Sequence, residues 1–222
     1  MRMRKKKHLD ERLKACEALL CEKPEAPIES SLRHFEREAP LCLEIGCGKG
    51  GFACGMAAKH PEACFYAMER IPNVMTAAVE RAKADADSRP TDNLRFIVAN
   101  AEALNEWFAP HSIDTLYLNF SDPWPKERHA KRRLTHRRFL SLYFGILKEN
   151  GQICFKTDNA GLFAFTLEEL AALGITPTFL TDDLHASERA AENVMTEYEK
   201  NFSEKGFSIH MVCFSAPKSE KA

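Results

Sequence analysis

Short apolar segments alternate with amphipathic segments along the chain from about residue 41 to residue 172. The apolar segments, such as residues 41–45 and 94–99, are nearly continuous, as expected of strands that are covered on both faces. The segments between them have the spacing of apolar positions that is typical of helices. This alternation predicts an α/β fold: a single Rossmann-like domain with a mostly parallel seven-stranded sheet and helices on both faces.

The predicted elements divide the chain into an N-terminal segment and a larger domain. We expect residues 1–38 to hold a basic start, a short helix over 9–21 and a connector with Pro and Glu, and residues 39–222 to form the domain. Its strands are predicted at 41–45, 63–68, 94–99, 113–120, 151–156, near 175 and at 207–214. Its helices are predicted at 52–59, 73–83, 102–108, 135–148, 162–172 and in the tail before 207.

Polar residues lie at the end of five of the predicted strands or directly after them. Ligands of open α/β sheets bind at the carboxyl ends of the strands, so these residues are the first candidates for a binding site. They are Glu44, Glu69, Asn100, the pair Ser121–Asp122 and the pair Thr157–Asp158.

A glycine-rich loop connects the first predicted strand of the domain to its first helix. The residues from Leu43 to Gly51 read LEIGCGKGG and fit the pattern G-x-G-x-x-G. Glycine permits a tight turn there and a close approach of the backbone to a ligand. A dinucleotide site, a methyl-donor site and a plain turn without a ligand are all compatible with this pattern alone.

The acids around this loop favour S-adenosylmethionine over a dinucleotide. Glu44 stands at the mouth of the loop, where its carboxylate would repel a pyrophosphate and attract a cationic group. S-adenosylmethionine carries an ammonium and a sulfonium and no phosphate. Glu69 has the spacing of an acid that accepts hydrogen bonds from ribose hydroxyls. We therefore expect a methyl donor at this loop, beside Gly46 and Gly48.

The fourth predicted strand ends in a stiff acidic corner, which reads NFSDPWP over residues 119–125. Its two prolines fix the backbone around Trp124. The carboxylate of Asp122 can accept hydrogen bonds from the N–H groups of a purine, and Trp124 can provide a wall or a stacking face. Alternatively, Asp122 is a turn acceptor and Trp124 belongs to the core.

The composition excludes several classes of protein. Of 222 residues, 45% are hydrophobic and 28% are charged, which excludes a disordered or collagen-like chain. No apolar run approaches the roughly 18 residues that a bilayer span needs, and the basic start is not followed by an apolar stretch, so we expect neither a membrane protein nor a secretory signal. The eight cysteines form no C-x-x-C pair. We expect reduced thiols in the cytoplasm and no metal site.

The net charge of −1 conceals two basic segments. Residues 126–138 contain seven Lys and Arg against one Glu, and residues 1–7 contain five basic residues and no acid, so the rest of the chain carries a net charge of −12. This distribution indicates a polyanionic partner, although a solvated charged face is the alternative. Neutralising about six phosphates would make log affinity fall with log salt at a slope of about −4 to −5.

Six segments together resemble the bacterial tRNA (guanine-N7-)-methyltransferases. The resemblance covers nearly the whole chain, and its longest segment is the most specific. The segments are MRMRKKK, LEIGCGKGGF, the strand end at Glu69, LYLNFSDPWPKERHAKRRLTHRRFL, ICFKTDN and NVMTEYEKNF.

The resemblance implies a class I methyltransferase that moves a methyl group from S-adenosylmethionine to N7 of guanine 46 in the variable loop of tRNA. Asp122 would be the catalytic residue. The donor would contact Glu44, Gly46, Gly48, Glu69, Asn100 and Asp122. The substrate would contact Lys126, Asp158, Thr196, Glu197, Tyr198 and Glu199, and the RNA would contact Arg128, His129, Ala130, Lys131, Arg132 and Arg133. Asn100 departs from the family, which often has Asp there, but its amide oxygen can still accept a hydrogen bond from the adenine amino group.

Other interpretations stay open beside the resemblance. Methylation of the exocyclic amino group of adenine is one rival, but its corner usually reads Asp/Asn-Pro-Pro-aromatic, and Trp124 stands at the second proline. A non-catalytic RNA-binding module is another. Asp158 or Asn159 fits a helix cap, and Thr196 with Glu199 fits a capping box. We expect a cytoplasmic protein that binds tRNA and no membrane, as a monomer or a homodimer.

Overall fold

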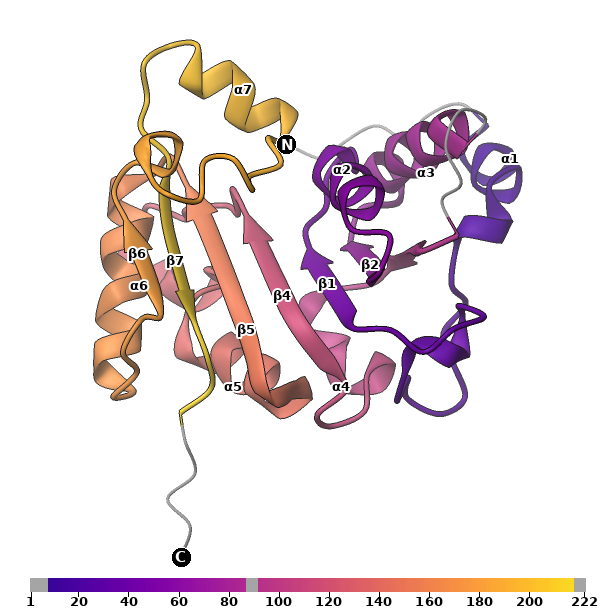
Figure 1. Ribbon diagram of the computed structural model, residues 1–222, viewed down its shortest axis with the longest axis horizontal. Coiled ribbons are helices and arrows are strands. Elements are labelled where there is room, and N and C mark those ends of the chain that lie inside the picture. The colour runs from indigo at the N-terminus through magenta and orange to yellow at the C-terminus, as the bar shows by residue number, and fades with distance from the viewer. Residues whose placement is uncertain (1–7, 87–91, 218–222) are drawn as a thin grey trace, which may run out of the picture.

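A computed structural model describes residues 8–86 and 92–217. Within them, the strands form a seven-stranded sheet in the order β3-β2-β1-β4-β5-β7-β6 (Figure 1). β7 is antiparallel to both of its neighbours, and the other pairings are parallel. The strands are β1 (Leu41–Ile45), β2 (Cys64–Glu69), β3 (Leu94–Val98), β4 (Ile113–Asn119), β5 (Leu147–Thr157), β6 (Phe179–Thr181) and β7 (His210–Phe214). The mostly parallel Rossmann-like sheet that the sequence predicts is confirmed.

Helices cover both faces of this sheet, because successive strand residues point to opposite faces. Leu41 and Leu43 of β1 belong to a core with the helices that follow β3, β4 and β5, whereas Cys42 packs with the two helices after β1 and β2. The helices are α1 (Leu9–Lys14), α2 (Gly51–Lys59), α3 (Pro72–Ala86), α4 (Leu104–Trp107), α5 (Arg137–Ile146), α6 (Ala160–Ala172) and α7 (Glu197–Ser203).

The helix predicted over residues 9–21 is interrupted in the structure. α1 ends at Lys14, and a 3-10 turn follows at Glu17–Leu19. Leu20 then forms a parallel bridge with Phe96 of β3, and the N–H of Cys21 donates to the Phe96 carbonyl oxygen at 2.8 Å. Pairing with an open strand edge therefore overrides helical propensity at the end of this segment.

The connector after this turn contributes to the core of the domain. Ile28 and Phe35 are buried in the same cluster as β1 and β4. The N–H of Ile28 donates to the carbonyl oxygen of Trp107 at 2.7 Å. The basic start at residues 1–7 lies outside the described residues, and the division of the chain at residue 38 stays a prediction.

The fifth strand is longer than predicted. β5 begins at Leu147, where the sequence indicates the end of a helix, and α5 ends at Ile146. Leu147 pairs with Ile113 of β4, and an irregularity in register separates this pair from the regular ladder that starts at Thr115 and Gln152. The extra strand residues thus form where β4 offers an unpaired edge.

No helix in the described part of the chain is both long and apolar enough to cross a bilayer. All eight cysteines lie within the described residues and are free thiols, and seven of them are buried. They pack as small apolar side chains.

The parallel strands bring the ends of β1, β2, β4 and β5 to one edge of the sheet, and α7 lies over this edge (Figure 1). The glycine-rich loop turns away from β1 there. Gly46, Gly48 and Gly50 have positive φ angles of 79°, 58° and 76°. A Cβ atom on Gly50 would lie 2.9 Å from Cβ of Ala78 in α3, so this residue needs glycine for both backbone and space.

The variant Gly50→Ala should therefore be less stable than the wild type. The left-handed conformation alone costs an L-residue about 1–2 kcal/mol, and the contact with Ala78 adds to this. The matched control is Gly145→Ala in α5, where no atom lies within 4 Å of the added Cβ and the helix should gain about 1 kcal/mol. Denaturant unfolding measures both; equal or greater stability of Gly50→Ala would contradict the packing described.

Candidate functional site

A pocket of about 490 Å³ opens at the carboxyl ends of β1 to β4. It brings together side chains and backbone from four loops that are far apart in the sequence. Predicted site residues that line it are Gly46, Glu69, Asn100, Asp122, Lys131 and Arg132, and Trp124 lines it as well. Acids and cations face the same space, which suits a ligand or pair of ligands with charges of both signs.

Glu44 and Gly48 are not among the residues that line this pocket. Glu44 is buried on β1, with 4% of its surface exposed, two residues before the pocket-lining Gly46. Its Oε1 atom accepts a hydrogen bond from Nδ2 of Asn119 at 2.8 Å, while Oε2 has no hydrogen-bond partner among the described residues. Burial raises the pKa of Glu44 to about 7. The hydrogen bond from Asn119 and the positive charge of Lys156 act in the opposite direction and limit the rise. A buried carboxylate with one free oxygen is suited to receive a cationic group.

Glu69 closes the other side of the glycine-rich loop. Its Oε2 accepts a hydrogen bond from the N–H of Gly48 at 3.3 Å, and its Oε1 accepts one from the N–H of Ile71 at 2.9 Å. Each carboxylate oxygen can accept a further hydrogen bond, so the side chain is fixed but still able to bind hydroxyl groups in the pocket.

Asn100 follows β3 and begins a short 3-10 turn. Its Oδ1 caps the N–H of Glu102 at 3.4 Å, and its Nδ2 donates to the Glu102 carboxylate at 3.2 Å. Arg138 of α5 forms an ion pair with the same carboxylate. Glu102 and Arg138 both line the pocket, so this pair borders the side of the pocket next to Asn100.

The acidic corner after β4 has a strained backbone, and hydrogen bonds from Arg133 hold it in place. Phe120 and Trp124 have positive φ angles of 49° and 42°, which are unfavourable for bulky residues. Arg133 donates from Nε to the carbonyl oxygen of Pro123 at 3.0 Å and from Nη2 to that of Trp124 at 3.2 Å. These bonds keep the exposed carboxylate of Asp122 at the pocket. Trp124 is half-buried and is not part of the core.

The basic segment divides into cations with partners and cations without. Arg137 pairs with Glu169 of α6, with Nη2 and Oε1 2.9 Å apart, and Arg138 pairs with Glu102. The acids that balance them come from distant parts of the chain. Because Arg137 and Arg138 are already paired, fewer than the six cations expected from the sequence are available to neutralise phosphates.

The remaining cations lie along a 3-10 helix at Glu127–Arg132. The guanidinium of Arg132 stacks 4.9 Å from the ring centre of Trp124, and the ring of His129 meets the same Trp124 edge-on. Lys126, Arg128 and Lys131 are exposed, and their side chains make no ion pair or hydrogen bond with the described residues. Ala130 accepts a backbone hydrogen bond from Arg133.

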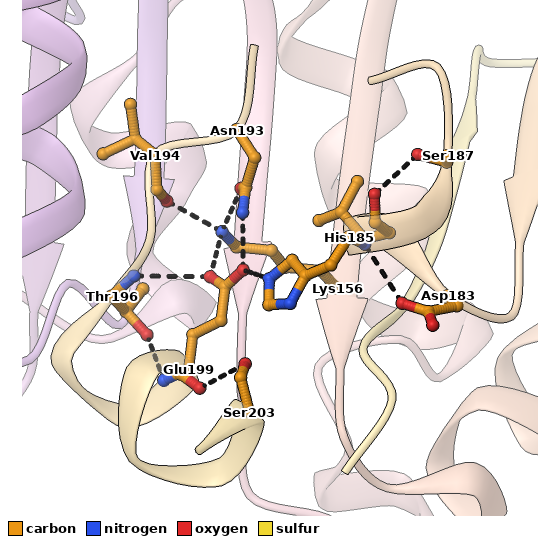
Figure 2. A network of polar contacts seen from close by, with 10 residues as sticks. Lys156, Asp183, His185, Ser187, Asn193, Val194, Thr196, Glu199 and Ser203 are labelled. Carbon is orange, nitrogen blue, oxygen red and sulfur yellow. Dashed lines mark hydrogen bonds and ion pairs between the residues drawn. The ribbon is translucent and has the colours of Figure 1, made fainter. Parts of the chain in front are cut away.

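The predicted substrate residues of the tail form the start of α7. Thr196 caps this helix by accepting a hydrogen bond from the N–H of Glu199 at 2.9 Å, and the Glu199 carboxylate returns to the Thr196 N–H, so the capping box is present. Glu199 is fully buried, and its carboxylate points toward Lys156, Asn193 and His185 (Figure 2). Glu197 forms an ion pair with Arg81 of α3, and the exposed Tyr198 lies with its hydroxyl 3.5 Å from Oδ2 of Asp158.

Asp158 does not cap α6. Its neighbour Asn159 does, because Oδ1 of Asn159 accepts a hydrogen bond from the N–H of Leu162 at 2.8 Å. Asp158 is half-buried after β5 and free to contact more than Tyr198. The pocket itself includes neither Asp158 nor any residue of α7.

Comparison with known proteins agrees with this geometry. Residues 38–212 match a family described as "Putative methyltransferase". A tRNA (guanine-N(7)-)-methyltransferase of Staphylococcus haemolyticus (strain JCSC1435) is 49% identical over 176 residues, which cover 79% of this chain and 80% of the relative. The enzyme of the same name from Lactococcus lactis subsp. cremoris (strain SK11) is 44% identical over 211 residues, 95% of each chain.

This chain belongs to the tRNA (guanine-N7-)-methyltransferase family. A solved structure of an antibiotic-related methyltransferase shares the fold with a TM-score of 0.60 at 14% identity, over 86% of this chain and 98% of the other. The class I methyltransferase fold and the enzyme class that the sequence predicts are confirmed.

The pocket of this methyltransferase fits S-adenosylmethionine, its methyl donor. Glu44 offers a buried, unpaired carboxylate oxygen to a cation, and Glu69 offers acceptors to hydroxyl groups. The loop between them has glycine at each position with a positive φ angle. The ionised carboxylate of Glu44, directly before this loop, would repel a pyrophosphate, so the residues present fit a cationic donor better than a dinucleotide.

Several residues of this site were missed by sequence reasoning. Asn119, which binds Glu44, lies inside the corner motif and could have been found as a polar residue in an apolar strand. Lys156, His185 and Asn193 surround the Glu199 carboxylate (Figure 2). No spacing in the sequence relates these three residues, so nothing pointed to them together.

The raised pKa of Glu44 predicts how stability depends on pH. Between pH 4.5 and about 7 the folded protein keeps a proton on Glu44 that the unfolded chain has lost, so the contribution of Glu44 to stability falls as pH rises through this window. A shift from 4.5 to about 7 corresponds to roughly 3 kcal/mol. The Glu44→Gln variant cannot titrate and should lose this part of the slope. Unfolding free energies measured across the window test this, and parallel profiles for the two proteins would contradict it.

Proposed function

We propose that this protein transfers the methyl group of S-adenosylmethionine to N7 of guanine 46 in the variable loop of tRNA. One observation carries the proposal beyond family membership. The pocket beside Gly46 and Glu69 also contains Asp122 and the cations Lys131 and Arg132, so a donor and an RNA base can meet at one edge of the sheet. The free cations continue outward from that edge along residues 126–132.

The donor is held by the ends of the first three strands. Glu44 accepts from the donor's ammonium group, and Glu69 accepts from its ribose hydroxyls. Gly46 and Gly48 allow close approach, and Asn100 offers its amide oxygen to the adenine. The bound donor supplies a methyl group on a positively charged sulfur.

Asp122 acts on the guanine. N7 of guanine carries a lone pair and no proton, so no general base is needed before attack. The exposed Asp122 carboxylate orients the base and stabilises the positive charge that grows on the ring. Its backbone is fixed by Arg133 and the two prolines, which preorganises the carboxylate for this task. Trp124 forms a wall of the pocket beside it.

The RNA is held by residues on both sides of the corner. Arg128, His129, Ala130, Lys131 and Arg132 contact the RNA backbone, and Arg133 contributes by holding the corner. Lys126, Asp158 and the segment Thr196–Tyr198 contact the target nucleotide. The partner is tRNA, met in the cytoplasm by a monomer or homodimer, and free thiols suit that reducing compartment.

Nucleoside analysis tests the proposed reaction. The protein is incubated with methyl-labelled donor and an unmodified tRNA transcript with G46, and with a matched transcript in which adenine replaces G46. We expect labelled 7-methylguanosine from the first transcript only. Label in a methylated adenosine, or no label, would overturn the reaction, and equal labelling of both transcripts would overturn the position.

The variant Asp122→Asn should lose turnover while keeping the fold. It preserves the size of the side chain but removes the charge that faces the developing cation, and kcat should fall by about 10²–10³-fold. The control Asp182→Asn neutralises an exposed carboxylate outside the pocket and should behave as the wild type. Single-turnover rates at saturating tRNA measure both. Near-normal methylation by Asp122→Asn would refute its catalytic role.

The double variant Arg128→Ala/Lys131→Ala should weaken tRNA binding and make it less dependent on salt. Loss of two phosphate contacts should reduce the slope of log affinity against log salt by about 1.4–1.8. The control Lys23→Ala/Lys83→Ala removes the same charge from lysines that already bind Glu106 and the Ala15 carbonyl. Binding titrations at several salt concentrations decide, and an identical change of slope in both double variants would contradict a defined RNA surface.

A further inference from the structure

A buried lysine of β5 joins the tail of the chain to the sheet. Lys156 is 2% exposed, and its Nζ atom donates to Oε2 of Glu199 at 2.6 Å, to Oδ1 of Asn193 at 2.8 Å and to the carbonyl oxygen of Val194 at 2.9 Å (Figure 2). All three protons of the ammonium are therefore used. Neither Lys156 nor Glu199 lines the pocket.

Glu199 completes this network from α7. Its Oε1 accepts from Nδ2 of Asn193 at 2.5 Å and contacts Nε2 of His185 at 2.8 Å, while its Oε2 also accepts from the N–H of Thr196. Burial raises the pKa of Glu199, but Lys156, His185 and Asn193 together hold it below its usual value. Because the carboxylate is fully buried and its oxygens are engaged, it does not face a substrate.

The pair connects the tail to both halves of the site. Nζ of Lys156 lies 5.8 Å from the ring centre of Phe120, and the Phe120 ring lies 5.1 Å from that of Tyr198. On the other side, the ammonium of Lys59 in α2 donates to the carbonyl oxygen of Ala191, and the Glu197 carboxylate lies beside Gly51 at the end of the glycine-rich loop. The segment 191–199 thus spans from the donor loop to the acidic corner.

We propose that the Lys156–Glu199 ion pair is a positioning element that fixes segment 193–199, above all Tyr198, against the Phe120 corner so that the target guanine is held at Asp122. The inference rests on the proposed function and adds two residues that touch neither guanine nor donor. A buried ion pair contributes little net stability compared with apolar packing, but its geometry admits one arrangement of the groups around it. That property suits a segment whose placement matters more than its strength of attachment.

Two single variants of the ion pair and one matched control test the proposal. Lys156→Met leaves a buried carboxylate without its cation and should release the segment, and Glu199→Gln neutralises the acid with little change of shape. The matched control is Lys148→Met, on the same strand at the opposite edge, where Lys148 pairs with Asp114 at 2.8 Å. Readouts are kcat and KM for tRNA, the Kd of S-adenosylhomocysteine and hydrogen exchange of residues 191–203.

Donor affinity is measured at about pH 8.5, because Lys156 also lowers the pKa of Glu44 and its loss must not protonate that acid. We expect kcat/KM for tRNA to fall at least about tenfold in Lys156→Met and about threefold in Glu199→Gln. The Kd of S-adenosylhomocysteine should change less than about threefold. Hydrogen exchange should rise in residues 191–203 and stay unchanged in β1 to β4.

The double variant Lys156→Met/Glu199→Gln separates positioning from a simple loss of folding. Removing both charges relieves the unpaired carboxylate, so the double variant should regain protection from exchange relative to Lys156→Met. Wild-type kinetics in the Lys156→Met protein would overturn the proposal, and so would a parallel loss of donor binding and tRNA turnover in all three network variants. If the wild type forms no 7-methylguanosine, the proposed function is wrong. Hydrogen exchange of residues 191–203 then still tests whether the ion pair fixes this segment.

Discussion

The site depends on one buried acid. Glu44 is the last residue but one of β1. Asn119 holds one of its carboxylate oxygens, the other has no hydrogen-bond partner among the described residues, and burial keeps water from solvating the charge. A buried carboxylate in this state is costly to ionise, which explains its raised pKa, and a cationic ligand would stabilise the ionised form. Gly46, Glu69 and Asp122 line the neighbouring pocket, and in the proposed function the acid, more than the glycines, selects a cationic donor.

The two halves of the site are built by different means. The half proposed to bind the donor consists of loops that directly follow parallel strands. Local geometry places these loops, through positive φ angles at Gly46 and Gly48 and the hydrogen bond from the N–H of Ile71 to Glu69. The half proposed to bind the substrate combines the corner after β4 with a tail that returns to the sheet through antiparallel β7. Buried charges in place of local turns attach this tail to β5, so the alignment of the two halves is a long-range property of the fold.

The sequence predicts most of the strands, the glycine-rich loop and the acids at the strand ends. The signals for them are local: the pattern of apolar residues, the spacing of glycines and the position of an acid at the end of an apolar run. Contacts between distant residues could not be predicted. The ion pairs Arg137–Glu169 and Arg138–Glu102 turn two of the six cations of an apparent phosphate surface into internal structure. Glu199 reads as a substrate contact in its motif, yet burial against Lys156 makes it part of the framework. Only tertiary packing distinguishes a charge that faces a ligand from one that faces its own fold.

Titration of the Glu44 carboxyl group tests the central claim most directly. Carbon-13 NMR of protein labelled at the glutamate carboxyl carbons follows Glu44, with Glu44→Gln to assign its signal, in the free protein and with S-adenosylhomocysteine bound. The account predicts a midpoint of about 7 in the free protein and a fall of at least about two units on binding, since the ligand's ammonium favours the ionised form. A midpoint near 4.5 in the free protein, or one that binding does not move, would contradict it.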